Sequence, residues 1–229
     1  MTGAPLDSGQ RQPGCLMGPA PYRVAGIGRL LQSLGLSVTD LGDLSLPAML
    51  PGTECANPAV DQLAWTAPIR DAVGHALDQG GMPVVLGGDH ALALGSVAGA
   101  ADHAARAGLP LFMLWLDAPS DFHTPLSMTS GNLRRVRDAD GMLHVSLDVD
   151  FLDPALAPAV GTTLPGGATF RETHLVCELI QDTGLMTSLN LVELNPFLDD
   201  RGRTAKLMVD LTGSLMGSKV FDRPTRSFT

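Results

Sequence analysis

Short apolar runs alternate with segments of helical periodicity along most of this 229-residue chain. Apolar runs of the length of one buried strand occupy residues 36–41, 82–86, 109–116, 142–147 and 186–194. Apolar residues recur at the spacing of amphipathic helices over residues 22–34, 60–79, 91–107, 170–183 and 204–215. This alternation is typical of a parallel sheet with helices on both faces. We therefore predict an α/β fold with three αβα layers and a doubly wound, mainly parallel sheet.

Two long stretches interrupt the alternation. Residues 117–141 are polar and contain no expected helix, and residues 151–167 form a predicted loop with several prolines. A segment as long as the first is uncommon inside a compact domain, so it is functional, disordered or the remnant of a lost part. We expect one domain over residues 1–217 and a poorly ordered tail over residues 218–229.

Three of the predicted strands end in residues that bind metal ions. Together these ends carry one imidazole and four carboxylates: His90, Asp117, Asp121, Asp148 and Asp150. Ligands of parallel sheets bind at the carboxyl ends of the strands, so these side chains could converge on one site. Taken singly, each motif also fits a turn or a helix start. Together they suit Mn²⁺ better than Zn²⁺, and two bridged ions would supply hydroxide for a hydrolysis.

Composition excludes several other classes of function. The net charge of −9 argues against nucleic acid, which needs clustered Lys and Arg. It would suit a cationic small molecule or a metal, although surplus acid more often serves solubility. No uncharged apolar run reaches the roughly 18 residues of a membrane span. The first residues lack the basic and apolar segments of a signal peptide, and three widely spaced cysteines fit a reducing cytoplasm. We therefore expect a cytoplasmic protein.

Four sequence blocks resemble the ureohydrolases, and within that superfamily they are most similar to arginase. The blocks are GGDHALALGSVAG, WLDAPSDFHTPLSMTSGNL, HVSLDVDFLDPALAPAVGTTLPGGATFRE and LVELNP, in the family's order. The resemblance extends from Gly3 to about Gly217. It implies an arginase-like fold, two Mn²⁺ ions and hydrolysis of the guanidinium of L-arginine to L-ornithine and urea.

The resemblance also implies roles for individual residues. One Mn²⁺ would be held by His90, Asp117, Asp121 and Asp148, and the second by Asp117, Asp148 and Asp150. Glu193 would face the guanidinium with Thr162 near it, and Asp121 and Glu193 would be the catalytic residues. Ser130 and Asn132 would bind the carboxylate and amine of the amino acid. Family members often form trimers or hexamers, which implies a homo-oligomer.

The chain departs from the family pattern at four places. Pro119 stands where the family has a histidine ligand of the second Mn²⁺, so one metal could be all that is retained. Arg134 replaces a histidine proposed to shuttle protons, and arginine is no acid or base near neutral pH. A segment with two strands is missing before residue 143, which would leave the run 109–116 at an exposed edge of the sheet. Fourth, the first strand lacks most of its apolar residues.

Several interpretations remain open on these grounds. We expect an arginase-type hydrolase whose catalysis is severely impaired. The alternatives are a non-catalytic relative with a structural or regulatory role, an agmatinase-like enzyme for another guanidino substrate, and a truncated product without stable function. His123 could replace the lost ligand, although a solvated loop histidine is the simpler interpretation. We expect His144 to be structural and His174 to lie on a helix surface.

Overall fold

Parallel strands at the centre of the molecule bring distant parts of the chain to one end of a sheet. The computed structural model describes residues 1–46, 58–118 and 133–219. In this part of the chain the strands are β1 (Thr2–Ala4), β2 (Val84–Gly87), β3 (Leu111–Leu116), β4 (Met142–Asp148) and β5 (Met186–Val192). Their order is β1-β2-β5-β4-β3, and every neighbouring pair is parallel. β3 is thus an edge strand, as expected for the run 109–116.

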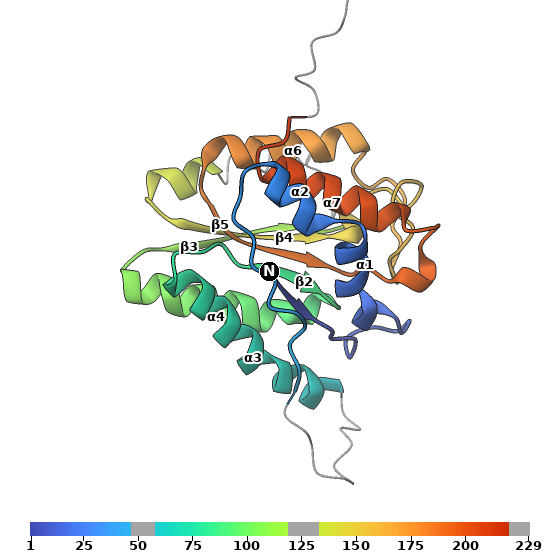
Figure 1. The fold of residues 1–229 in the computed structure, drawn as a ribbon, viewed down its shortest axis with the longest axis horizontal. Coiled ribbons are helices and arrows are strands. Elements are labelled where there is room, and N and C mark those ends of the chain that lie inside the picture. Colours follow the sequence, from blue (N-terminus) through green and yellow to red (C-terminus); the bar gives the residue numbers. More distant parts are fainter. Residues whose placement is uncertain (47–57, 119–132, 220–229) are drawn as a thin grey trace, which may run out of the picture.

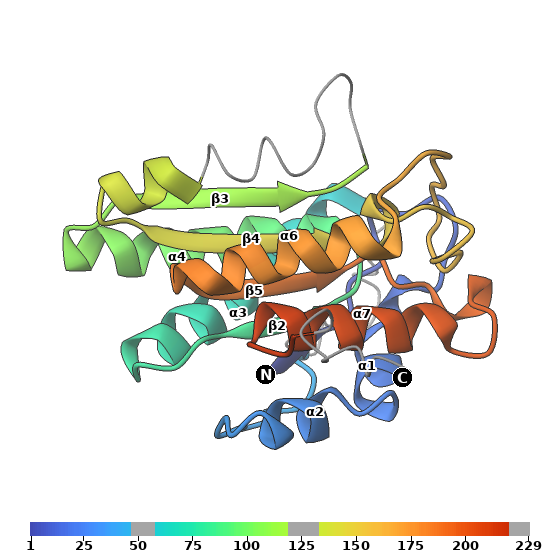
Figure 2. The same cartoon turned by 90° about the horizontal axis from the view of Figure 1, so that it is seen from above.

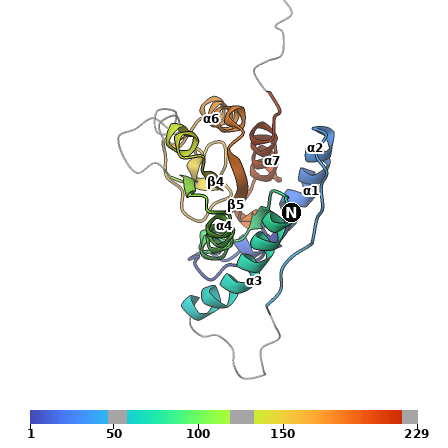
Figure 3. The same cartoon turned by 90° about the vertical axis from the view of Figure 1, so that its left-hand side faces the viewer.

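Helices cover both faces of this sheet (Figures 1 and 3). One layer contains α3 (Pro58–Asp78) and α4 (Ala93–Ala107), and the other contains α1 (Pro19–Val24), α2 (Ile27–Ser33), α6 (Phe170–Thr183) and α7 (Arg203–Leu215). Short 3₁₀ helices span Cys15–Met17, His90–Leu92, Val149–Phe151 and Pro196–Leu198. Side chains alternate along each strand, so that Leu86 packs towards α6 and α7 whereas Val85 packs towards α3 and α4. The predicted three-layer α/β fold is confirmed.

Helix α6 begins and ends at the predicted residues because local signals fix both ends. The Thr169 hydroxyl accepts a hydrogen bond from the backbone of Glu172, whose carboxylate accepts one from the backbone of Thr169, which forms a capping box. Gly184 follows the helix with φ 66°, a left-handed conformation that glycine adopts without strain.

The N-terminal region differs from the prediction in two respects. The expected helix over residues 22–34 is divided into α1 and α2, because Gly26 adopts φ 93° between them. The expected strand over residues 36–41 is wrong, since this segment is irregular. Apart from its pairing with β2, β1 forms only an isolated bridge between Gly3 and Asp43 in the described residues. The first strand is three residues long and contains no large apolar side chain, in line with the sequence.

Two further expectations are wrong. Residues 133–138 are helical, although we predicted no helix over 117–141. Leu133 and Val136 lie three positions apart, on one face of this turn, and both are buried in the main core. His174 is fully buried instead of lying on the surface of α6, and its Nδ1 lies 2.8 Å from the Ser214 hydroxyl of α7. His144 is buried within β4 and has the expected structural role.

Candidate functional site

Four neighbouring strands each end in an ionisable residue at the same end of the sheet. His90 follows β2, Asp117 follows β3, Asp148 closes β4 and Glu193 follows β5. Because these strands are parallel and adjacent, their carboxyl ends meet at one edge. The chain turns sharply there: Asp148 Oδ1 accepts a hydrogen bond of 2.8 Å from the backbone N–H of Asp150 and caps the 3₁₀ turn that follows.

His90, Asp117 and Asp148 form a group that could hold a metal ion. Each offers one ligand atom, and these atoms all lie within 4.8 Å of one another. Nδ1 of His90 is 2.7 Å from Asp148 Oδ2 and 3.4 Å from Asp117 Oδ2. These three predicted ligands are therefore brought together.

Asp150 lies beside this group through the backbone that follows β3. The N–H of Ala118 donates to Asp150 Oδ1 at 3.0 Å and to Asp117 Oδ1 at 2.7 Å. The two carboxylates therefore share one donor, although they come from different strands. This places Asp150 next to Asp117, as a pair of ligands for one ion would require.

Two residues that the sequence analysis did not single out hold the ring of His90. Its Nε2 lies 2.9 Å from the hydroxyl of Ser146, and the indole N–H of Trp115 points to its Nδ1 at 3.3 Å. The His90 and Trp115 rings pack at 4.7 Å between centroids. Ser146 lies two positions before Asp148 on β4, and Trp115 lies two positions before Asp117, which directly follows β3. The period of two along a strand could therefore have indicated them.

Glu193 is held in an uncommon backbone conformation at the end of β5. Its φ is 70°, which costs free energy in a residue other than glycine and is found preferentially at functional sites. Its Oε1 accepts a hydrogen bond of 2.6 Å from the backbone N–H of His90. This contact fixes the glutamate beside the residues that end β2 and β4.

Burial shifts the protonation of this whole group. Desolvation raises the pKa of Asp148 well above its usual value, and the charge of Glu193 adds to the effect. Burial and the nearby Asp148 and Asp117 raise the pKa of Asp150 to about 8, and burial raises the pKa of Glu193 to about 7. Desolvation lowers the pKa of His90 despite its acidic neighbours. The site thus disfavours charge on every one of these groups.

These residues fit a divalent cation. In the described part of the chain, no Lys or Arg forms an ion pair with Asp117, Asp148 or Asp150, so the burial of Asp148 is not compensated by a basic side chain. Nδ1 of His90 faces both an N–H donor and a carboxylate acceptor, and one ring nitrogen satisfies only one of them. A cation beside Nδ1 would use its lone pair, leave Nε2–H to donate to Ser146 and neutralise the carboxylates.

Several predicted site residues are not part of this geometry. Asp121, Ser130 and Asn132 lie outside the described residues, as do Pro119 and His123. Thr162 is exposed in the loop between β4 and α6. Arg134 is exposed on the short helix over 133–138.

Two buried polar residues next to the site attach the N-terminal loop to it. The carboxylate of Asp89 accepts hydrogen bonds from the backbone N–H groups of Gly9 and Ala91 at 2.5 and 3.0 Å. The side-chain amide of Asn195 donates to the backbone carbonyl of Pro13 at 3.1 Å. Their contacts with the N-terminal loop join residues 80 and 182 positions apart, so no local pattern in the sequence indicates them.

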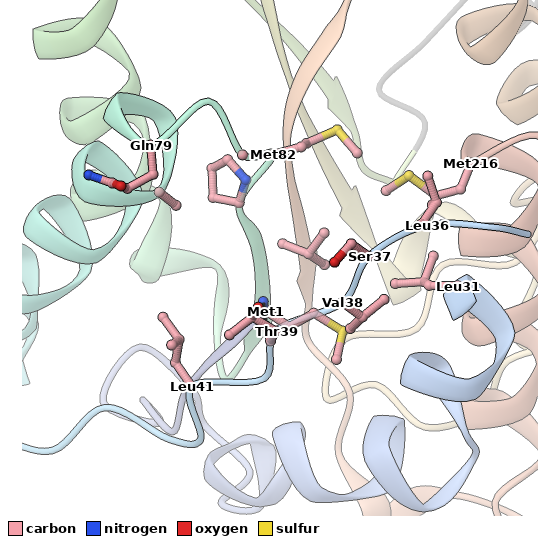
Figure 4. Close-up of a pocket in the computed structure, with 14 residues that line it drawn as sticks. Met1, Leu31, Leu36, Ser37, Val38, Thr39, Leu41, Gln79, Met82 and Met216 are labelled. Atoms are coloured by element: carbon pink, nitrogen blue, oxygen red, sulfur yellow. Dashed lines mark hydrogen bonds between the residues drawn. The ribbon is translucent and has the colours of Figure 1, made fainter. Parts of the chain in front are cut away.

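A separate hollow of about 450 Å³ lies at the opposite end of the sheet. It is lined mainly by apolar side chains from the starts of β1 and β2, from α2 and from the segment after it, including Met1, Leu31, Val38 and Met82 (Figure 4). Carboxylates and imidazoles are absent from its lining among the described residues. It therefore has no part in the chemistry at the strand ends.

The fold and the site define an α/β protein that gathers carboxylates and an imidazole at the carboxyl end of a parallel sheet. The sequence model of the Arginase family matches residues 1–135 and 132–217. The arginase of Agrobacterium fabrum is 41% identical, with 99% of this chain and 93% of that protein covered. The arginase of Brucella melitensis is 42% identical, with 99% and 98% covered. This chain belongs to the arginase family.

Solved structures agree with this assignment. The crystal structure of arginase from Bacillus subtilis superposes with a TM-score of 0.78 at 28% identity, covering 96% of this chain and 98% of that one. The alignment with the Agrobacterium protein runs over 301 positions, more than the 229 residues of this chain, so that relative carries residues this chain lacks. The two family matches meet at residues 132–135, where the sequence analysis expects a missing segment.

Proposed function

We propose that this protein is an arginase-type hydrolase that cleaves the guanidinium of L-arginine to L-ornithine and urea, with reduced turnover. The observation that carries the proposal is the convergence of His90, Asp117 and Asp148, whose ligand atoms lie within 4.8 Å of one another at the strand ends. We place the protein in the cytoplasm as one domain over residues 1–217. No helix in the described part of the chain is long and apolar enough to cross a bilayer.

In this proposal Mn²⁺ is the cofactor. One ion would be held by His90, Asp117, Asp121 and Asp148, and a second would rely on Asp117, Asp148 and Asp150. The oxygen-rich donor set suits Mn²⁺. When bound, such an ion supplies Lewis acidity and makes hydroxide available at neutral pH.

The chain's own residues would bind and orient the substrate. Glu193, fixed by the backbone N–H of His90 at 2.6 Å, would accept hydrogen bonds from the cationic guanidinium, assisted by Thr162. The carboxylate of Asp121 would take up a proton during the hydrolysis. Ser130 and Asn132 would bind the carboxylate and amine of the amino acid.

Three features support reduced turnover. Pro119 offers no donor atom where the family has a histidine, which leaves the second ion three carboxylates. Arg134 cannot shuttle protons near neutral pH. The relatives also carry residues that this chain lacks, and the two family matches meet at residues 132–135, next to the expected substrate residues Ser130 and Asn132. Loss of several such groups typically costs several kcal/mol of transition-state stabilisation.

Urea release from L-arginine, measured with purified protein and added Mn²⁺ and combined with the metal content per chain, tests this proposal. We expect slow release and fewer than two Mn²⁺ per chain. Pro119→His should raise the metal content, whereas Pro119→Ala, the matched control, should not. Ordinary turnover with two ions would refute the role of Pro119. Bound metal without turnover would favour the non-catalytic alternative, and urea from agmatine alone would favour the agmatinase-like one.

A further inference from the structure

Glu193 is held in its left-handed backbone conformation from both sides. Before it, β5 pairs with β2, and the N–H of Glu193 itself donates to the carbonyl of Gly88 at 2.9 Å. After it, Leu194 is fully buried, and the N–H of Asn195 donates to the carbonyl of Ala159 at 2.8 Å. A strained residue keeps such a conformation only where its surroundings over-determine it. The contacts of Asn195 therefore bear directly on Glu193.

The side chain of Asn195 joins two segments that are far apart in the sequence. It is buried, and its Oδ1 accepts a hydrogen bond of 3.1 Å from the N–H of Phe197. Its Nδ2 donates to the carbonyl of Pro13 at 3.1 Å and lies 3.4 Å from the carbonyl of Gln12. The amide is thus an acceptor towards the 3₁₀ helix that follows Glu193 and a donor towards the N-terminal loop.

The N-terminal loop, residues 7–15, connects the end of β5 with the loop between β4 and α6. Figure 2 shows the first loop in blue and the second in gold at the same end of the sheet. A Cβ on Gly161 would lie 2.8 Å from Oε1 of Gln10, so the side chain of Gln10 packs on the backbone just before Thr162. The N-terminal loop therefore links the two residues expected at the guanidinium, Glu193 and Thr162.

The loop presents a preformed surface to the Asn195 amide. The carboxylate of Asp7 accepts hydrogen bonds from the N–H groups of Gly14 and Cys15 at 2.9 and 3.0 Å, which closes the loop upon itself. Gly14 has φ 141°, and a Cβ there would overlap the side-chain amide of Asn195. Only glycine leaves room at this position for the amide to reach the loop.

We propose that Asn195 is a positioning residue for the guanidinium site. Its amide holds the N-terminal loop against the 3₁₀ helix Pro196–Leu198. This contact fixes the backbone of Glu193, aims its carboxylate into the site and keeps the loop in place beside Thr162. The inference rests on the proposed function, because it concerns how Glu193 receives a guanidinium. Asn195 itself touches neither metal nor substrate.

Urea release from L-arginine, measured together with the Mn²⁺ content per chain, tests this role. Asn195→Ala should raise the KM for L-arginine about tenfold or more, because Glu193 is no longer aimed at the guanidinium. The Mn²⁺ content should stay that of the wild type, since the ligands are unchanged. Asn190→Ala is the matched control, because this buried asparagine of β5 bonds the hydroxyl of Ser96 on α4 at 2.7 Å. It should keep the wild-type KM even if it lowers the stability of the fold.

A double-variant comparison separates positioning from a loss of stability. Calorimetry with L-arginine measures the affinity of each variant without relying on turnover. If Asn195 acts through Glu193, the chain with both Asn195→Ala and Glu193→Gln should bind L-arginine as weakly as Glu193→Gln alone. Effects that add would overturn the proposal, and so would a KM that rises as much in Asn190→Ala as in Asn195→Ala.

A change in the loop tests the same contact from its other side. Gly14→Ala should displace the amide and raise the KM. Gly80→Ala should not, because Gly80 also has a positive φ but has no atom within 4 Å of an added Cβ. Asn195→Ala and Gly14→Ala should also speed trypsin cleavage after the exposed Arg11 about tenfold, since the loop opens more often.

Failure of this inference and failure of the proposed function give different results. Unchanged KM values in Asn195→Ala and Gly14→Ala would overturn the inference alone, whether or not trypsin cleaves the loop faster. A wild type that releases no urea from L-arginine would refute the proposed function, and the calorimetric comparison would still test Asn195. A wild type that does not bind L-arginine would overturn both.

Discussion

At the scale of single residues, His90 lies among more partners than one neutral imidazole can satisfy. Its Nδ1 is within 3.4 Å of a buried carboxylate, a second carboxylate and an indole N–H. A proton on Nδ1 would satisfy Asp148 and conflict with Trp115, and a lone pair there would do the reverse. A cation bound at Nδ1 would use that lone pair and neutralise the carboxylates, while Trp115, which is 50% exposed, can donate its N–H to water instead. We therefore regard this group as a metal site rather than a hydrogen-bond cluster.

The first prediction concerns Asp148, the most deeply buried of the three proposed ligands that the structure brings together. Mn²⁺ at about a hundredfold excess over its dissociation constant should stabilise the wild-type fold by about 2.7 kcal/mol. Asp148→Asn should lose most of this gain because an amide is a weak ligand. Asp102→Asn, an exposed carboxylate on α4, should keep it. Thermal unfolding with and without Mn²⁺ measures the gain, and equal stabilisation of both variants would contradict the assignment.

The second prediction concerns Ser146, which lies 2.9 Å from Nε2 of His90. Ser146→Ala leaves the ring without its partner and should weaken metal binding about 10- to 100-fold. Ser188→Ala is the matched control, because that hydroxyl contacts Nδ1 of His144 at 2.7 Å, in the buried interior of β4 and β5. Titration against a chelator compares the affinities. An unchanged affinity in Ser146→Ala would show that the ring is oriented without this serine.

At the scale of elements, local signals and tertiary contacts determine different parts of the fold. The bounds of α6 follow from its capping box and Gly184, so the sequence predicted them correctly. The helix over 133–138 is too short to form on its own and depends on burial of Leu133 and Val136 against β3 and β4. Residues 133–138, LRRVRD, contain only two apolar side chains. Their spacing alone is too weak a pattern to predict a helix.

The third prediction tests the start of α6. Thr169→Ala removes the hydroxyl that caps the backbone N–H of Glu172 and should lower the free energy of unfolding by about 1 kcal/mol. Glu172→Gln should cost less, since the glutamine side-chain oxygen can still accept the hydrogen bond from the backbone N–H of Thr169. Urea unfolding of the metal-free protein measures both. A Thr169→Ala variant as stable as the wild type would show that packing against α7 alone fixes this end of the helix.

At the scale of the whole molecule, buried histidines make folding sensitive to acid. Burial lowers the pKa of His144 to about 4, from its ordinary value of 6.5. Between these pH values the unfolded chain binds a proton that the folded chain does not. The neutral side chain of His144 therefore makes its full contribution to the free energy of unfolding above pH 6.5. This contribution is lost as the pH falls towards 4.

The fourth prediction follows from this linkage. Between about pH 7.5 and about pH 5 the wild type should lose about 2 kcal/mol through His144, and His144→Gln should not lose this part. The lowered pKa of His174 acts in the same direction in both chains, and the raised pKa of Asp150 acts in the opposite direction. The difference between the chains thus isolates His144. Urea unfolding at the two pH values measures it, and the same pH dependence in both chains would contradict the prediction.

The sequence by itself determined the alternation of strands and helices, the residues at the strand ends and the family. Those properties follow from spacing along the chain, which is local. The sequence could not determine how the strand ends meet, because the residues that meet are far apart along the chain. His90 and Asp148 are separated by 58 positions, and His90 and Glu193 by 103.

Sheet order and register decided what the sequence left open. They bring Trp115 and Ser146 onto the ring of His90, fix Glu193 in a left-handed backbone conformation and leave β3 without a partner on one side in the described residues. The physical reason is that each of these features depends on contacts between separate strands. Such contacts exist only once the sheet has formed around the buried side chains of both helix layers.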